Sequence, residues 1–208
     1  MLNSVDLTIS LPLLKSLRID TVAPTMGQLL AAISAPALEF LGLDNIIEKD
    51  LVAIFERLQL QAYPHRFPCL QDLSVSLLRG RLIRQVLWTP FCSVFPHITH
   101  LTVLLYADEI YTLKPLMVAL SLKIRAAPNS PPIPLVLPKL QTLSFNHESI
   151  GTVMLCDVVS NRAVAGHALS SLQPRGILDN NAYSSSLDWL REHVKVGEHQ
   201  AEESNDDN

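Results

Sequence analysis

The stretch FPCLQDLSV, residues 67–75, decides the fold, because its pattern recurs along the chain. The shared form is proline, any residue, leucine or isoleucine, two variable residues, leucine, one variable residue and an apolar residue. Complete copies begin at residues 11, 35, 67, 95 and 137, and a degraded copy, GHALSSLQP, begins at residue 166. The last two apolar positions stand two apart, as an inward-facing strand requires, and the earlier leucine turns the chain into that strand. Each copy therefore predicts one short parallel strand.

The spacing of the copies indicates a repeat protein. Successive proline positions, with His167 taking this place in the degraded copy, stand 24, 32, 28, 42 and 29 residues apart. This range matches or somewhat exceeds the roughly 20 to 29 residues of leucine-rich repeats. Leucine alone supplies 37 of the 208 residues, as expected if one packing position is filled many times.

Helical spacing of apolar residues appears between the copies. It is clearest over residues 46–58, where Asn45 is the expected cap and Glu48 stands three residues later, as in a capping box. Weaker helical patterns cover residues 25–34, 81–87, 111–125, 149–162 and 186–194. The alternation predicts an α/β fold, a leucine-rich-repeat solenoid arc with parallel strands on the concave face and helices on the convex face. A doubly wound sheet is the rival, but only seven glycines are present and none forms a phosphate-binding turn.

The two ends of the chain differ from its body, which we expect to be one arc of about six irregular repeats over residues 1–196. Val5, Leu7 and Ile9 alternate like a strand, yet the next strand follows too soon for a crossover helix. We therefore expect the arc to be N-terminally truncated. Residues 197–208 hold five acidic residues and no Lys or Arg, which predicts an acidic disordered tail.

Charge and cysteine content restrict the class of partner. The chain has 16 basic and 20 acidic residues, and without the tail the acidic number falls to 15, so the body is nearly neutral. A near-neutral body argues against nucleic acid as a partner. The three cysteines fit neither a metal pair nor a disulfide framework, and we find no signal peptide and no apolar run long enough to cross a membrane. We expect a cytoplasmic or nuclear protein with no membrane partner.

Strand alternation predicts which side chains leave the core and face the hollow of the arc. This surface is mixed in charge and mostly small and polar, which suits a protein partner better than a phosphate backbone. A plain solvated sheet face is the alternative. The candidate partner-binding residues are Arg18, Asp20, Phe40, Asp44, Asp72, Ser74, His100, Thr102, Thr142, Ser144 and Asn146.

No catalytic residue, metal ligand or cofactor is predicted. Asp72 and His100 occupy equivalent positions of consecutive copies, with Ser74 and Ser144 nearby, but a flat sheet lacks the sharp turn and oxyanion donors that a nucleophile needs. We interpret the pair as a cross-strand hydrogen bond. Trp88 and Trp189 are expected to be packing residues. The proline-rich segment 125–138 is expected to be an inserted stiff loop that happens to contain an RxxPxxP spacing.

The phrases LPKLQTLSF and FPCLQDLSV, the segment MLCDVVSNRAVAGHALSSL and the closing LDWLREHVKV together resemble the C-terminal leucine-rich part of F-box proteins of mushroom-forming fungi. The resemblance implies that the arc selects a protein substrate for a cullin-type ubiquitin ligase, while the F-box docks on the ligase adaptor. We find no F-box in this chain, so adaptor binding would require one upstream of Met1. A freestanding structural or regulatory repeat protein is the alternative.

Overall fold

The computed structural model describes residues 8–20, 25–59, 66–78, 83–105, 113–121, 136–146, 152–174 and 184–197. These residues form an α/β fold in which one seven-stranded sheet has the order β2-β4-β5-β6-β7-β8-β9 and every neighbouring pair is parallel. Its strands are β2 (Ser16–Asp20), β4 (Phe40–Ile46), β5 (Asp72–Leu77), β6 (His100–Leu105), β7 (Thr142–Phe145), β8 (Ser171–Pro174) and β9 (Lys195–Val196). A separate two-stranded parallel ladder joins β1 (Ile9–Ser10) to β3 (Ile33–Ser34).

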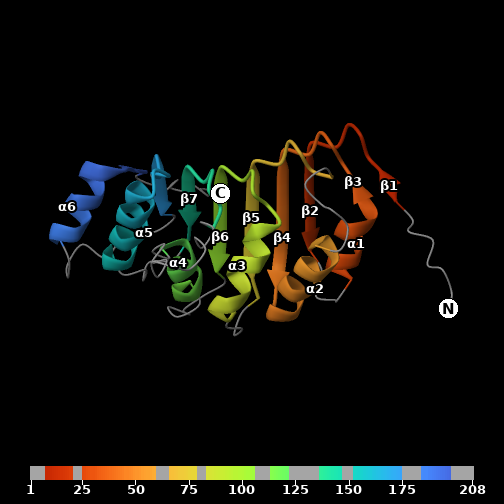
Figure 1. The fold of residues 1–208 in the computed structure, drawn as a ribbon, viewed down its shortest axis with the longest axis horizontal. Helices are drawn as coiled ribbons and strands as arrows, with labels where there is room; N and C mark the ends of the chain where they lie inside the picture. Colours follow the sequence, from red (N-terminus) through yellow and green to blue (C-terminus); the bar gives the residue numbers. More distant parts are fainter. Residues whose placement is uncertain are drawn as a thin grey trace, which may run out of the picture.

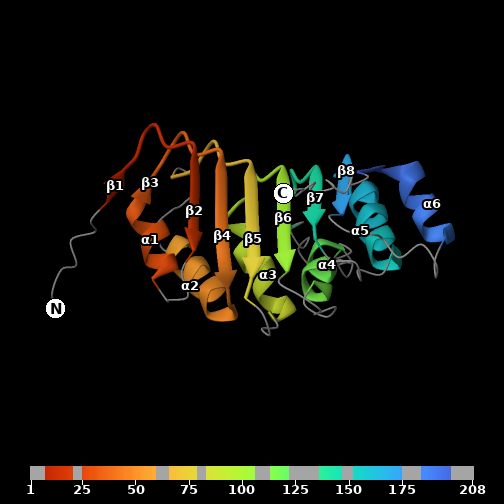
Figure 2. The same cartoon turned by 180° about the vertical axis from the view of Figure 1, so that it is seen from behind.

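Helices alternate with these strands and lie on one face of the sheet (Figure 1). Seen from behind, the strands of the sheet stand in front of the helices, so the helix layer covers a single face (Figure 2). The helices of the described residues are α1 (Met26–Ala32), α2 (Glu48–Gln59), α3 (Gln85–Ser93), α4 (Lys114–Ser121), α5 (Thr152–Val164) and α6 (Ser184–His193). The predicted alternation of parallel strands and helices is confirmed.

The copies of the phrase fold into strands that start in the same register. The first residue of each strand pairs with the first residue of the next, in the row Ser16, Phe40, Asp72, His100, Thr142, Ser171 and Lys195. Because strand side chains alternate between faces, this register brings equivalent residues of every copy onto the same face. All six copies therefore form strands at the predicted positions, including the degraded one.

The proline of each complete copy lies in a turn that leads into the strand. The N–H of Leu14 donates to the carbonyl of Leu11, and the same bond over three residues recurs in each complete copy, as from Leu140 to Leu137. Proline favours the second position of such a turn because its ring fixes φ near the required value. The phrase thus encodes a turn as well as a strand.

A column of shared carbonyls aligns the start of the strands. The carbonyl of Lys15 accepts the N–H groups of Glu39 and Phe40, and the carbonyl of Glu39 accepts those of Gln71 and Asp72. The carbonyls of Gln71, Thr99 and Gln141 each accept two consecutive N–H groups of the following strand in the same way. Each repeat is therefore registered on its predecessor by two backbone hydrogen bonds.

The core lies between the sheet and the helices. The leucine positions of the five later copies are 4% exposed or less, and they pack against buried helix residues such as Leu30, Ile54 and Leu155. Trp88 is fully buried with its ring edge-on to Phe91, which confirms the packing role predicted for it. Trp189 is partly buried and stacks on His193.

Several local predictions differ from the structure. Asn45 does not cap the helix at residue 48, because β4 continues to Ile46 and Asn45 has a φ of 57° where the register against β5 shifts. Ile47 precedes the helix instead, and its N–H donates to the Asp50 carboxylate 2.9 Å away. The helix predicted over residues 25–34 ends at Ala32, so that its last two residues form β3. α3 begins later than predicted.

Other predictions fall on residues that the structure does not describe. Val5, Leu7, most of the proline-rich segment and residues 198–208 of the predicted acidic tail lie outside the described residues. Gly197, at the start of that tail, still donates its N–H to the Leu172 carbonyl. Among the described helices, none has the length and apolar character needed to cross a membrane.

Candidate functional site

The sheet face away from the helices, here called the strand-lined face, carries the predicted candidates. Alternation sends the first, third and fifth residues of each strand to this face. The structure leaves eight of the eleven candidates exposed or partly exposed: Arg18, Asp20, Phe40, Asp44, Asp72, His100, Thr102 and Asn146. The accessible part of the predicted surface therefore runs over β2, β4, β5 and β6, and Asn146 adds to it just after β7.

The first two strands hold a compact polar cluster. Arg18 Nε lies 2.9 Å from Asp44 Oδ2, and the Asn45 amide donates to Asp20 Oδ1 at 2.6 Å. The stem of Arg18 and the ring of Phe40 both lean over Gly42, where an added Cβ would come within 3.2 Å of each. Because glycine has no side chain there, a guanidinium and an aromatic ring lie beside each other on the surface.

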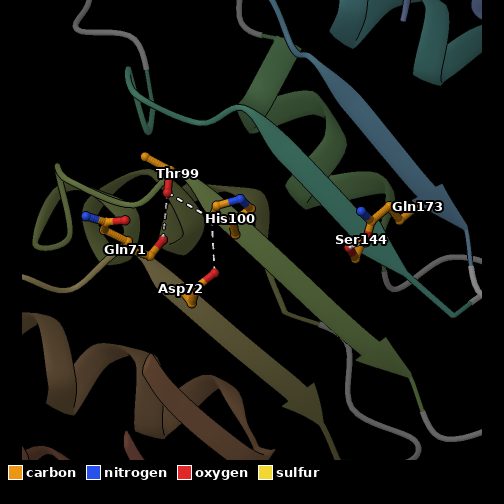
Figure 3. Close-up of polar contacts among 6 residues, drawn as sticks. All are labelled: Gln71, Asp72, Thr99, His100, Ser144 and Gln173. Atoms are coloured by element: carbon orange, nitrogen blue, oxygen red, sulfur yellow. Dashed lines mark hydrogen bonds and ion pairs between the residues drawn. The ribbon is translucent and has the colours of Figure 1, made fainter. Parts of the chain in front are cut away.

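The middle strands hold a second pair. His100 Nδ1 lies 3.0 Å from Asp72 Oδ1 and 2.9 Å from the hydroxyl of Thr99, whose oxygen also lies 3.4 Å from the Gln71 carbonyl (Figure 3). Both side chains of the Asp72–His100 pair are about half exposed. The predicted cross-strand contact is confirmed, and it leaves a carboxylate and an imidazole on the surface.

The serines do not join this pair. Ser144 donates its hydroxyl to Gln173 Oε1 at 3.0 Å, on strands away from His100 (Figure 3). Ser74 is buried, as are Thr142 and Ser144. These three side chains therefore differ from the prediction: they point away from the helix layer but expose almost no surface.

Asn146 is partly exposed, and its side-chain amide is hydrogen-bonded within the chain. Its amide oxygen accepts the N–H of Leu105 at 2.6 Å, and its amide nitrogen donates to the Leu105 carbonyl at 3.0 Å. Both ends of the side chain are thus used in extending the contact between β7 and β6. This role is structural, because an asparagine amide can replace a missing backbone partner at the end of a strand.

Three contributors to the strand-lined face were missed among the candidates. Asn45 and Thr99 orient Asp20 and His100, respectively, and Lys195 extends the first-residue row to β9. Thr99 could have been found, since it directly precedes the first strand position of its copy. Lys195 could not, because β9 contains only two residues and no copy of the phrase.

Among the described residues, neither the buried thiols nor the metal-ligating side chains point to a further site. Complete burial raises the pKa of the Cys92 thiol to about 12, and burial followed by the charge of Asp157 raises the pKa of Cys156. A raised pKa leaves a thiol protonated and poorly nucleophilic. In the part of the chain that is described, no group of three or more His, Cys, Asp or Glu side chains is placed to hold a metal ion.

Comparison of the chain with protein-family models, with curated proteins and with solved structures finds no match. The support for a function therefore comes from the strand-lined face and from the repeat that builds it.

Proposed function

We propose that this chain is a non-catalytic protein-binding module, a solenoid arc of the leucine-rich-repeat type whose partner binds the strand-lined face. One observation carries the proposal: the strands begin in the same register, on a face that none of the described helices covers. Stacked units of this kind bury a continuous core and leave an extended row of side chains free for recognition.

The composition of the exposed row favours a protein partner. Phe40 gives an apolar anchor, Arg18 with Asp44 gives an oriented pair of opposite charge, and Asp72 with His100 gives a carboxylate beside an imidazole. Interfaces between proteins combine aromatic and arginine anchors with a polar surround. A nucleic acid would instead require a track of unpaired basic side chains along its phosphates. The described strands carry acids beside their bases on this face.

The resemblance to F-box proteins makes a ubiquitin-ligase substrate, in the cytoplasm or the nucleus, the first class of partner to test. Under this reading the strand-lined face holds the substrate, and an F-box upstream of Met1 would be needed for contact with the ligase adaptor. A freestanding repeat protein that binds a structural or regulatory partner is the alternative. Translation of the transcript upstream of Met1 separates the two.

The test of the proposed face is a double variant, Phe40→Ala with Asp72→Lys. We expect at least a fivefold loss of the protein captured from an extract of the producing cells, because the apolar anchor is removed and one charge is inverted. The melting temperature should fall by only a few degrees, since both side chains are partly exposed.

The matched control places the same two changes on the helix layer, as Val86→Ala with Asp188→Lys. Both control residues are two-thirds exposed and lie on α3 and α6. The control should capture as much protein as the wild type. Equal losses in the two double variants, or no loss in either, would mean that the strand-lined face does not bind the partner.

A further inference from the structure

The strand-lined face over β2, β4, β5 and β6 carries more acid than base. The charged side chains at the first, third and fifth positions of these strands are Arg18, Asp20, Asp44 and Asp72. Arg18 is paired with Asp44 at 2.9 Å, and the Asn45 amide donates to Asp20. Among the described residues, the only side-chain partner of Asp72 is the imidazole of His100. The surplus of negative charge on this part of the face therefore lies at Asp20 and Asp72, and only Asp72 has an imidazole beside it.

The geometry of the Asp72–His100 pair fixes which imidazole nitrogen carries the proton. His100 Nδ1 lies 3.0 Å from Asp72 Oδ1, and an ionised carboxylate only accepts hydrogen bonds, so Nδ1 is the donor. The position of Thr99 agrees, because its hydroxyl can donate to the Gln71 carbonyl 3.4 Å away while its oxygen accepts from Nδ1 at 2.9 Å (Figure 3). In the neutral ring, Nε2 of His100 is then an acceptor.

Two acceptor atoms of this pair are unused. Within the described part of the chain, no hydrogen-bond donor contacts Asp72 Oδ2 or His100 Nε2. The side chains are 44% and 47% exposed, so a ligand can reach both of them. The pair therefore offers two acceptors and one negative charge. A ligand that complements it must donate two hydrogen bonds and carry a positive charge.

An aromatic side chain stands next to the pair. Phe40 is in register with Asp72, and Asp72 with His100, so these residues follow one another in the first-position row of β4, β5 and β6. Neighbouring strands of a sheet lie only about 5 Å apart. Phe40 is partly exposed, and Arg18 lies on its β2 side, over Gly42. On the β5 side, the neighbour of Phe40 in this row is Asp72.

A guanidinium group complements this row better than an ammonium group does. The guanidinium is planar, always charged and presents its N–H donors in a fixed fork, so that one group can donate to a carboxylate and to a second acceptor beside it. Its flat face also packs against an aromatic ring. A lysine ammonium is a compact and strongly hydrated point charge without such a face.

We propose that Phe40, Asp72 and His100 form a recognition site for an arginine side chain of the protein partner. The guanidinium donates to Asp72 Oδ2 and to His100 Nε2, and it packs against the ring of Phe40. This inference rests on the proposed function and deepens it, because it assigns the chemistry of the partner: the segment that binds the strand-lined face is basic and presents an arginine.

The test is an NMR titration of the full chain with a blocked tripeptide, acetyl-Ala-Arg-Ala-amide, followed through the imidazole signals of His100. We expect saturable shifts with a dissociation constant in the millimolar range. Asp72→Asn should weaken binding about fivefold, because it removes the charge and keeps the shape. Phe40→Leu should weaken it about threefold, because it keeps an apolar side chain without the ring. The same peptide with lysine in place of arginine should bind about twofold more weakly.

The matched control is Asp188→Asn, which removes the same charge from α6 in the helix layer, where the side chain is 67% exposed. This variant should bind the arginine peptide like the wild type. Three results would each overturn the proposal: no saturable shift, equal weakening by Asp72→Asn and Asp188→Asn, or equal binding of the arginine and lysine peptides.

Failure of this inference can be told apart from failure of the proposed function. Suppose that Phe40→Ala with Asp72→Lys loses the captured protein while the arginine peptide gives no saturable shift. The strand-lined face then binds a protein, and only the recognition of arginine is wrong. If the double variant instead captures as much protein as the wild type, the proposed function fails and this inference falls with it.

Discussion

The first repeat and the repeat of β7 follow the same phrase but pack very differently. Leu140 and Leu143 are 1% and 0% exposed, whereas Leu14 and Leu17, at the same positions, are only partly buried. Among the described strands of the sheet, β7 has a neighbour on both sides and β2 has a neighbour on one side. The phrase therefore determines the shape of a repeat, while its neighbours determine how much of it is buried. Stability in such a stack depends on the contacts between adjacent units.

The largest expected difference comes from removing the same leucine in each repeat. Leu143→Ala should lower the free energy of unfolding by about 2–5 kcal/mol, the cost of a cavity at a closed core position. Leu17→Ala should cost clearly less than half of that, because solvent already reaches the site. Urea unfolding of both variants measures the difference, and equal losses would contradict the role assigned to the neighbours.

The next largest effect on the free energy of unfolding is expected from a buried arginine that supports the β7 repeat. Arg162 of α5 is fully buried and donates to the carbonyls of Val136 and Leu137, at 3.0 and 2.8 Å, in the turn before β7. Leu137 has a φ of 50°, a conformation that needs support in a leucine. Burial also lowers the pKa of Arg162 to about 10.

Arg162→Met should cost about 2–4 kcal/mol, because it leaves these buried carbonyls without a donor. Chemical denaturation of the variant is compared with that of Arg191→Met, in which an exposed arginine of α6 is replaced at little cost. A loss no greater than that of Arg191→Met would show that the turn before β7 is stable without the arginine.

The packing of α1 on α2, one of the contacts between the first two repeats, is tested at Gly27. An added Cβ would lie 2.6 Å from the Ala53 carbonyl oxygen, so α1 and α2 must separate to accept it. Gly27→Ala should therefore destabilise the chain by about 1–3 kcal/mol, less the small gain in helix propensity. Thermal unfolding is the measurement, with Gln28→Ala on the exposed side of the same helix as control. A stabilised Gly27→Ala variant would disprove the close approach.

The smallest expected effect is a pH dependence of the folding stability, caused by the buried thiol of Cys92 in α3. Burial raises the pKa of Cys92 to about 12, whereas an unfolded thiol titrates near about 8.5. Between these values the unfolded chain loses the proton that the folded chain keeps. Unfolding is then favoured, and stability falls by about 1.4 kcal/mol per pH unit as the pH rises.

Cys92→Ala should flatten this fall when urea unfolding is repeated between about pH 8.5 and 10. Cys69→Ala, at an exposed thiol, should keep the wild-type dependence. If both variants follow the wild-type curve, Cys92 is not the group responsible.

The sequence predicted the strands far better than the exposure of their side chains. Period-two apolar positions and the preceding proline are local signals, so even the degraded copy ending at Pro174 was placed correctly. A strand through Ile9 was expected, but β9, β3 and the pairing of β1 with β3 were missed, because each of these strands contains only two residues. The capping error at Asn45 arose because Ile46 and Ile47 fit a strand end and a helix start equally well.

The sequence did not reveal which side chains on the strand-lined face are exposed to solvent. Strand alternation correctly places Ser144 and Leu143 on opposite faces of the sheet, yet both side chains are buried. The exposure of a side chain depends on neighbours that can be far apart in the sequence. The two hydrogen bonds from Asn146 to Leu105 likewise join residues 41 apart. The Asp72–His100 pair was predictable because equivalent positions of adjacent copies become neighbours.

The column of carbonyls that begins at Lys15 sets where this chain can change length during evolution. Each strand starts at a fixed backbone contact with its predecessor, although 24 to 42 residues separate successive copies. Additional residues are therefore accommodated between the end of one strand and the turn before the next. A gene of this kind can gain or lose segments there, or exchange a whole unit, without shifting the register of the strands that remain.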